Sequence, residues 1–145
     1  MDDAFVWELE DILADRKGEC YRNAGIATIH SVSQEGFGAK IHAKGMALSY
    51  AVGFIVPPDK VLQPHAWTMV SDGKKSFYWD CTLQKNSRSW RSDNSGFQYL
   101  QRQTFDVDEL KAWLRSKYSG REFSILGLPD GLFRFPIITK TGSIE

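Results

Sequence analysis

A short turn between two strand-like segments constrains the fold of this chain more than any other feature. The segments His65 to Val70 and Ser76 to Cys81 are rich in aromatic and apolar residues, and the step Asp72-Gly73 lies between them. This pattern predicts a β-hairpin of two antiparallel strands. His65 and Asp80 are 15 residues apart, so folding about the turn places them roughly opposite each other, where cross-strand Cβ atoms lie about 4.5–5.5 Å apart. A hydrogen bond between the two side chains is therefore expected.

The segments around this hairpin predict a mixture of helices and strands. The apolar run from Ala47 to Val56 predicts a long strand, which Pro57 closes. A capping-box pattern from Asp106 to Glu109 predicts the start of a helix. Helical spacing of apolar residues predicts three helices in all, over Ala4 to Ala14, from Cys20 toward His30, and from about Val107 to Lys117.

Three further segments are less regular. Phe97 to Phe105 fits either a strand or a short helix, Ser31 to Met46 has the composition of a loop, and the residues after Gly120 predict turns with one edge strand. The chain has 145 residues, 42% of them hydrophobic, which is enough for one core, so residues 1–145 are expected to form a single domain. The expected fold class is α+β, with a nucleophile-bearing helix packed on an antiparallel β-sheet of about three to five strands.

Charge and cysteine content exclude several classes of partner. Eighteen basic residues balance eighteen acidic ones, so no net field favours nucleic acid or a membrane surface. Met1 to Ala4 lack the features of a signal peptide, and no apolar run reaches the roughly 18 residues of a membrane span. The two cysteines favour free thiols in a reducing compartment over a disulfide framework. We therefore expect a cytoplasmic protein.

Cys20, His65 and Asp80 are the residue types of an activated thiol nucleophile. Cys20 lies at the predicted start of a helix, where the helix dipole and a protonated imidazole would favour the thiolate. Its backbone N–H would face the oxyanion that forms when the sulfur attacks an amide carbonyl. His65 would act as general base and acid, and Asp80 would fix its tautomer. Contact between Cys20 and His65 depends on tertiary packing, because 45 residues separate them.

Each of these residues also has a purely structural interpretation when it is taken alone. Cysteine is often buried as a small apolar residue, histidine can be a hydrogen-bonded core residue, and Asp80 can begin a turn with Thr82. Together with Cys81 the three could ligate zinc, but the chain has no Cys-x-x-Cys or His-x-x-x-His spacing to support this. The order and context of the segments favour a catalytic site without a metal or a cofactor.

Three short motifs occur in a defined order along the chain. They are a helix-borne Gly-x-Cys, a strand that opens with His-Ala-Trp and a strand that ends in Asp-x-Thr, here Gly18 and Cys20, His65 to Trp67, and Asp80 with Thr82. Over about residues 17 to 126, this set resembles the core of the transglutaminase-like branch of the papain-type thiol superfamily. The chain also resembles small bacterial and phage-encoded proteins of unassigned activity, through Cys20 to Ala24 and Tyr50 to Gly53.

The resemblance implies a papain-like fold and a thiol-dependent acyl transfer on an amide of a protein or peptide substrate. Deamidation of glutamine, or cleavage of a peptide or isopeptide bond, is favoured over transamidation. The glutamine that papain-like enzymes carry shortly before the cysteine is absent here, so the second oxyanion donor is open. Asn23 and Gln63 are the candidates, and Trp67 either roofs the site or fills the core.

A different class of function is a catalytically inactive binding or inhibitor protein on the same scaffold, for instance one encoded by a phage. Trp90, Phe97 and Tyr99 would then supply an exposed aromatic surface that grips a partner protein. The rate at which Cys20 is alkylated below pH 7 distinguishes this class from an enzyme, because only an activated thiol reacts there faster than a free one.

Overall fold

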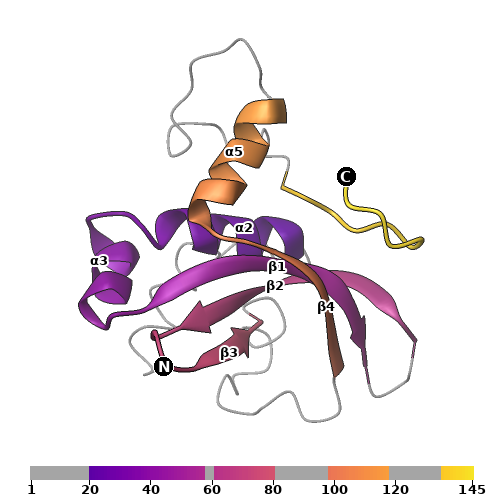
Figure 1. Cartoon of the computed structure of the whole chain (residues 1–145), viewed down its shortest axis with the longest axis horizontal. Helices are drawn as coiled ribbons and strands as arrows, with labels where there is room; N and C mark the ends of the chain where they lie inside the picture. Colours follow the sequence, from indigo (N-terminus) through magenta and orange to yellow (C-terminus); the bar gives the residue numbers. More distant parts are fainter. Residues whose placement is uncertain (1–19, 58–60, 81–97, 118–134) are drawn as a thin grey trace.

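The computed structural model of the chain describes residues 20–57, 61–80, 98–117 and 135–145. Within these ranges the fold is α+β, with a four-stranded antiparallel sheet and three helices (Figure 1). The strands are β1 (Ala47–Val56), β2 (Gln63–Ser71), β3 (Ser76–Trp79) and β4 (Gln98–Phe105), in the order β3-β2-β1-β4. The helices are α2 (Cys20–His30), α3 (Gly36–Ala43) and α5 (Val107–Lys117). The helix predicted over Ala4 to Ala14 lies outside the described residues.

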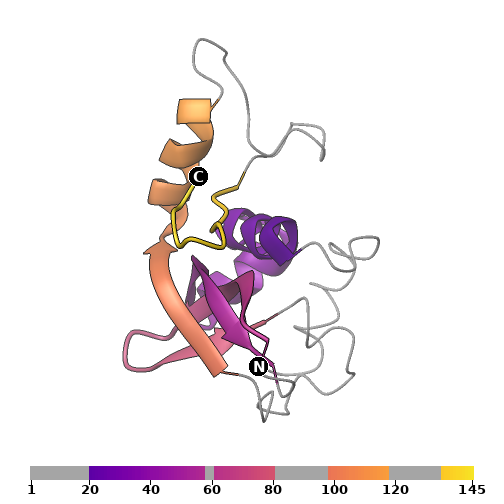
Figure 2. The same cartoon turned by 90° about the vertical axis from the view of Figure 1, so that its right-hand side faces the viewer.

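Side chains of the inner strand β1 pack on both faces of the sheet. On one face Tyr50 and Val52 join the main core, which α2 and α5 complete. On the other face Ala51 and Ile55 pack with the fully buried Trp67. Both β1 and β4 bend strongly along their length (Figures 1 and 2). The sheet therefore has an apolar side toward α2 and a second, smaller cluster on the side away from it.

The local sequence signals predicted most of these elements correctly. Strands β2 and β3 form the expected hairpin, in which Asp72 Oδ1 accepts backbone hydrogen bonds from Lys74 and Lys75, each 2.8 Å long. The capping box of α5 is also present, because Asp106 and Glu109 each accept a hydrogen bond from the backbone N–H of the other, at 2.8 and 3.1 Å. The segment that fitted either a strand or a short helix is the strand β4.

The loop predicted from Ser31 to Met46 is wrong, because this segment contains the helix α3. Phe37 and Ile41 lie one helical turn apart and are 3% and 2% exposed, so they bury one side of the helix in the main core. The polar and glycine residues around them concealed this spacing. The expected edge strand near the C-terminus is, within residues 135–145, a single bridge between Ile138 and Ile144.

Residues of the C-terminal segment pack over α2. The buried Tyr50 hydroxyl donates to the carbonyl of Pro136, and the Phe135 ring stacks on Tyr50 at 6.0 Å. Phe135 also fills the space beside Gly25, since a Cβ placed on that glycine would lie 2.4 Å from the ring. The packing of Phe135 therefore requires glycine at position 25, and the favourable packing offsets the weak helix propensity of glycine.

We expect Gly25→Ala to lower the free energy of unfolding by about 1–3 kcal/mol, because the added methyl group overlaps the Phe135 ring. Urea denaturation measures the change. In a Phe135→Ala background the overlap is gone, so the same substitution should instead raise the free energy of unfolding by up to about 1 kcal/mol through helix propensity. A substitution that has the same effect in both backgrounds would contradict this packing.

Candidate active site

The hairpin brings His65 and Asp80 together through side chains that are almost fully buried. Thr68 pairs with Trp79, so Asp80, which follows β3 directly, lies diagonally across from His65. His65 Nε2 and Asp80 Oδ2 are 2.6 Å apart, and the two residues are 6% and 1% exposed. The hydrogen bond expected from the hairpin is thus present, although Asp80 lies two residues away from the position directly opposite His65.

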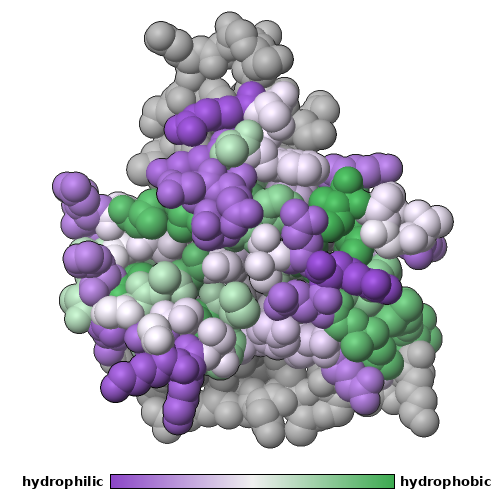
Figure 3. Space-filling view, in the orientation of Figure 1, coloured by the Kyte–Doolittle hydropathy of each residue, from purple (hydrophilic) through white to green (hydrophobic). Residues whose placement is uncertain are grey.

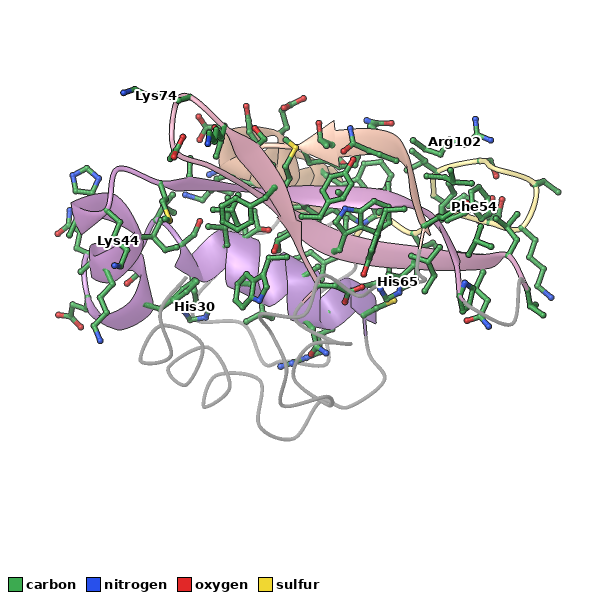
Figure 4. All side chains as sticks on the ribbon, turned by 90° about the horizontal axis from the view of Figure 1, so that it is seen from below. His30, Lys44, Phe54, His65, Lys74 and Arg102 are labelled. Carbon is green, nitrogen blue, oxygen red and sulfur yellow. The ribbon has the colours of Figure 1, made fainter. Side chains whose placement is uncertain are left out.

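Helix α2 supplies the third residue of the site. Cys20 is the first residue of α2 and is a partly exposed, free thiol. Cys20 lies close enough to His65 to raise the pKa of its imidazole. In Figure 4, α2 runs along the sheet with α3 near one end, and the labelled His65 lies near the other, N-terminal end. Because Nε2 of His65 binds Asp80, Nδ1 is the ring nitrogen left for the sulfur.

The charge state of His65 follows from these two neighbours. Burial of the ring by itself lowers the pKa of His65. The hydrogen bond to Asp80, the proximity of Cys20 and the negative charge of the carboxylate outweigh burial and raise the pKa of His65 to about 9. At neutral pH the imidazole is therefore protonated, and it carries a proton between a carboxylate and a sulfur.

An aromatic cluster supports the His65 ring. The rings of His65 and Trp67 stack at 6.0 Å with an interplanar angle of 23°. Trp67 is fully buried and touches Tyr99 and Tyr78, with ring centroids 5.0 and 5.5 Å away. Trp67 thus fills the core beneath His65 and has no exposed surface to offer a substrate.

Tyr99 is a residue of this site that the sequence did not reveal. Its hydroxyl donates a 2.9 Å hydrogen bond to Asp80 Oδ2, the same oxygen that binds His65. The sequence predicts Tyr99 to be one of three exposed aromatic residues, but its ring is half-buried against Trp67. Trp90 and Phe97, the other members of that group, lie outside the described residues.

The two candidates for a second oxyanion donor differ in position. Asn23 lies one helical turn after Cys20 and is 1% exposed, so it belongs to the interior of α2 packing. Gln63 is exposed at the start of β2, two residues before His65 and on the same side of the strand. Gln63 is therefore the candidate that a bound substrate could reach.

The surface beside this site is partly apolar. Val61 and Leu62, directly before β2, are 57% and 52% exposed. Hydrophobic residues gather at that end of the molecule in the view of Figure 3. A separate pocket of about 480 Å³ opens near α3, and its lining, which includes Ser31, His42 and Met46, contains no residue of the candidate site.

The described parts of the chain contain neither a candidate metal site nor a candidate membrane span. No three His, Cys, Asp or Glu side chains in those ranges are grouped so that they could hold a metal ion. None of the described helices combines the length and apolar character of a membrane span. Comparisons with protein-family models, with curated proteins and with solved structures gave no match.

Proposed function

We propose that this protein is a thiol-dependent acyl-transfer enzyme that acts on amides. Cys20 would be the nucleophile, His65 the proton carrier and Asp80 the residue that orients His65. The observation that carries the proposal is the buried hydrogen bond between His65 and Asp80 with Cys20 beside the imidazole, which brings together residues from α2, β2 and the end of β3. We also propose that α2 and the sheet correspond to a papain-like core, in line with the transglutaminase-like motifs of the sequence.

The electrostatics of the site suit the first chemical step. A protonated His65 beside Cys20 favours the thiolate, and the N-terminal end of α2 adds the positive end of the helix dipole. The thiolate sulfur would attack the carbonyl carbon and form a C–S bond. The backbone N–H of Cys20, in the first turn of the helix, would donate to the carbonyl oxygen as it becomes negative.

Proton transfer from His65 would complete the acylation. Nδ1 of His65 gives its proton to the departing nitrogen, the C–N bond breaks, and ammonia or an amine leaves. The neutral imidazole then accepts a proton from water, which attacks the thioester, and the C–S bond breaks to release a carboxylic acid. Asp80 keeps Nε2 protonated throughout, so the same ring nitrogen faces the sulfur in both steps.

We propose hydrolysis of a protein or peptide amide, and in particular deamidation of a glutamine or cleavage of a peptide or isopeptide bond. The exposed side chains of Val61 and Leu62 provide an apolar surface next to the strand that carries His65, and this surface suits the side chains that flank an amide in a polypeptide. A reducing compartment such as the cytoplasm would keep Cys20 as the thiol.

A screen of glutamine-containing proteins and peptides by mass spectrometry tests this proposal. We expect a gain of about one dalton on glutamine, or cleavage products, and an acyl adduct on Cys20 when the reaction is quenched with acid. Cys20→Ala should abolish product and adduct, whereas Cys81→Ala, which removes the other cysteine of the chain, should retain both. An intact protein that forms neither product nor adduct would favour a binding protein on the same scaffold.

A further inference from the structure

We propose that Tyr99 is a positioning residue of this site, which fixes the Asp80 carboxylate that in turn holds His65. The inference rests on the proposed function, because it assigns a role within the same set of residues. It starts from one shared atom. Asp80 Oδ2 accepts one hydrogen bond from His65 Nε2 at 2.6 Å and another from the Tyr99 hydroxyl at 2.9 Å.

The burial of Asp80 makes this second donor important. Asp80 is 1% exposed, so water cannot replace a donor that is lost without a change in structure. A buried carboxylate needs hydrogen bonds to remain ionised and to keep one orientation. Tyr99 supplies such a bond from β4, a strand that is separated from β3 by two others in the sheet. The bond therefore depends on the curvature of the sheet.

A β-bulge in β4 determines which side of the sheet Tyr99 faces. Val52 pairs with Gln103 and Gly53 with Gln101, so one extra residue, Arg102, is inserted at this point. An insertion of one residue exchanges the two faces of the strand beyond it. With the bulge, Tyr99 pairs with Ile55 and faces the same side as Trp67. Without it, Tyr99 would point toward the α2 side.

The position opposite the bulge permits only glycine without rearrangement. A Cβ on Gly53 would lie 2.1 Å from the carbonyl oxygen of Leu100. Gly53 is also the residue of β1 that pairs with His65 on β2. The same close approach of the strands that forms the bulge thus lies next to His65, as expected of a bulge that aims a side chain into a functional site.

Tyr99→Phe tests the role of the hydroxyl, and Tyr78→Phe is the matched control. Both tyrosines pack on Trp67, but the Tyr78 hydroxyl donates to Gln101 instead of Asp80. The first measurement is the titration of the His65 ring by NMR. Loss of the Tyr99 donor removes one group that stabilises the carboxylate charge, so more of that charge acts on His65, and the titration midpoint should rise by roughly 0.3 to 1 pH unit in Tyr99→Phe and stay unchanged in Tyr78→Phe.

The second measurement is the rate of Cys20 alkylation by iodoacetamide at pH 7. Without the Tyr99 hydrogen bond the carboxylate can turn, so it no longer fixes the orientation of the His65 ring toward Cys20, and we expect the rate to fall about three- to tenfold in Tyr99→Phe only. A midpoint for His65 that is unchanged or lowered in Tyr99→Phe overturns the inference. The proposed function fails on a separate result, a wild-type Cys20 that reacts no faster than a free thiol, and the titration of His65 tests Tyr99 even then.

Discussion

Replacing His65 with alanine should lower the rate at which iodoacetamide alkylates Cys20 at pH 6 by about 10- to 100-fold. An ordinary thiol is less than about 1% ionised at this pH, and only the thiolate reacts. In the folded protein His65, with its pKa raised to about 9, places a positive charge beside the Cys20 sulfur at this pH, and the proposed function requires this charge to favour the reactive form of the thiol. Part of the gain is lost because a stabilised thiolate is a weaker nucleophile. The rate constant, measured from pH 5 to 9, should therefore show a plateau in the wild type that the variant lacks.

The design of this experiment separates chemistry from folding. His65→Ala leaves the buried carboxylate of Asp80 without one of its donors, so His65→Gln, whose amide can still donate, is measured alongside it. A Cys81→Ser background makes Cys20 the only cysteine. If the wild type matches glutathione below pH 7, or if both His65 variants retain its rate, Cys20 is not an activated nucleophile.

Local sequence signals explain why much of the fold could be predicted. The turn at Asp72 and the reciprocal bonds of Asp106 and Glu109 each involve residues within four positions of one another. The residues that identify these features in the sequence are therefore the same residues that form the bonds. Helix α3 escaped prediction because its stability comes from burial of Phe37 and Ile41 in the core and not from its local composition.

The candidate site likewise combines a local contact, which could be predicted, with contacts that depend on tertiary packing. The contact between His65 and Asp80 follows from a hairpin, which is local, and was predicted. The contact between Cys20 and His65 requires α2 to pack on β2, and the contact between Tyr99 and Asp80 requires both a bulge and a curved sheet. Periodicity in the sequence specifies which residues lie on one face, but a one-residue bulge reverses that assignment without a clear signal. The hydrogen bond between Tyr99 and Asp80 could therefore be recognised only in the structure.

In a Cys20→Ser background, the stability of the protein should decrease as the pH rises from about 6.5 toward 9, because of His65. The background is needed because a Cys20 thiol that loses its proton on folding would cancel the proton that His65 gains. The pKa of His65 is about 9 in the folded state, whereas a histidine in an unfolded chain titrates near 6.5. Below pH 6.5 both states hold the proton, and the stabilisation from the charged ring is complete. Between the two values only the folded state holds it, so each pH unit lowers the free energy of unfolding by up to about 1.4 kcal/mol, on the order of 3 kcal/mol in total.

Urea denaturation between pH 6 and pH 9.5 measures this effect, with His65→Gln as the reference for every other titrating group. The difference in stability between the proteins with and without His65 should shrink as the pH rises. Asp80→Asn should lower the pKa of His65 from about 9, because burial lowers it and the carboxylate no longer opposes burial. A Cys20→Ser protein whose stability varies with pH as that of the same protein with His65→Gln does would contradict the charged, carboxylate-bound histidine on which the proposed proton transfer depends.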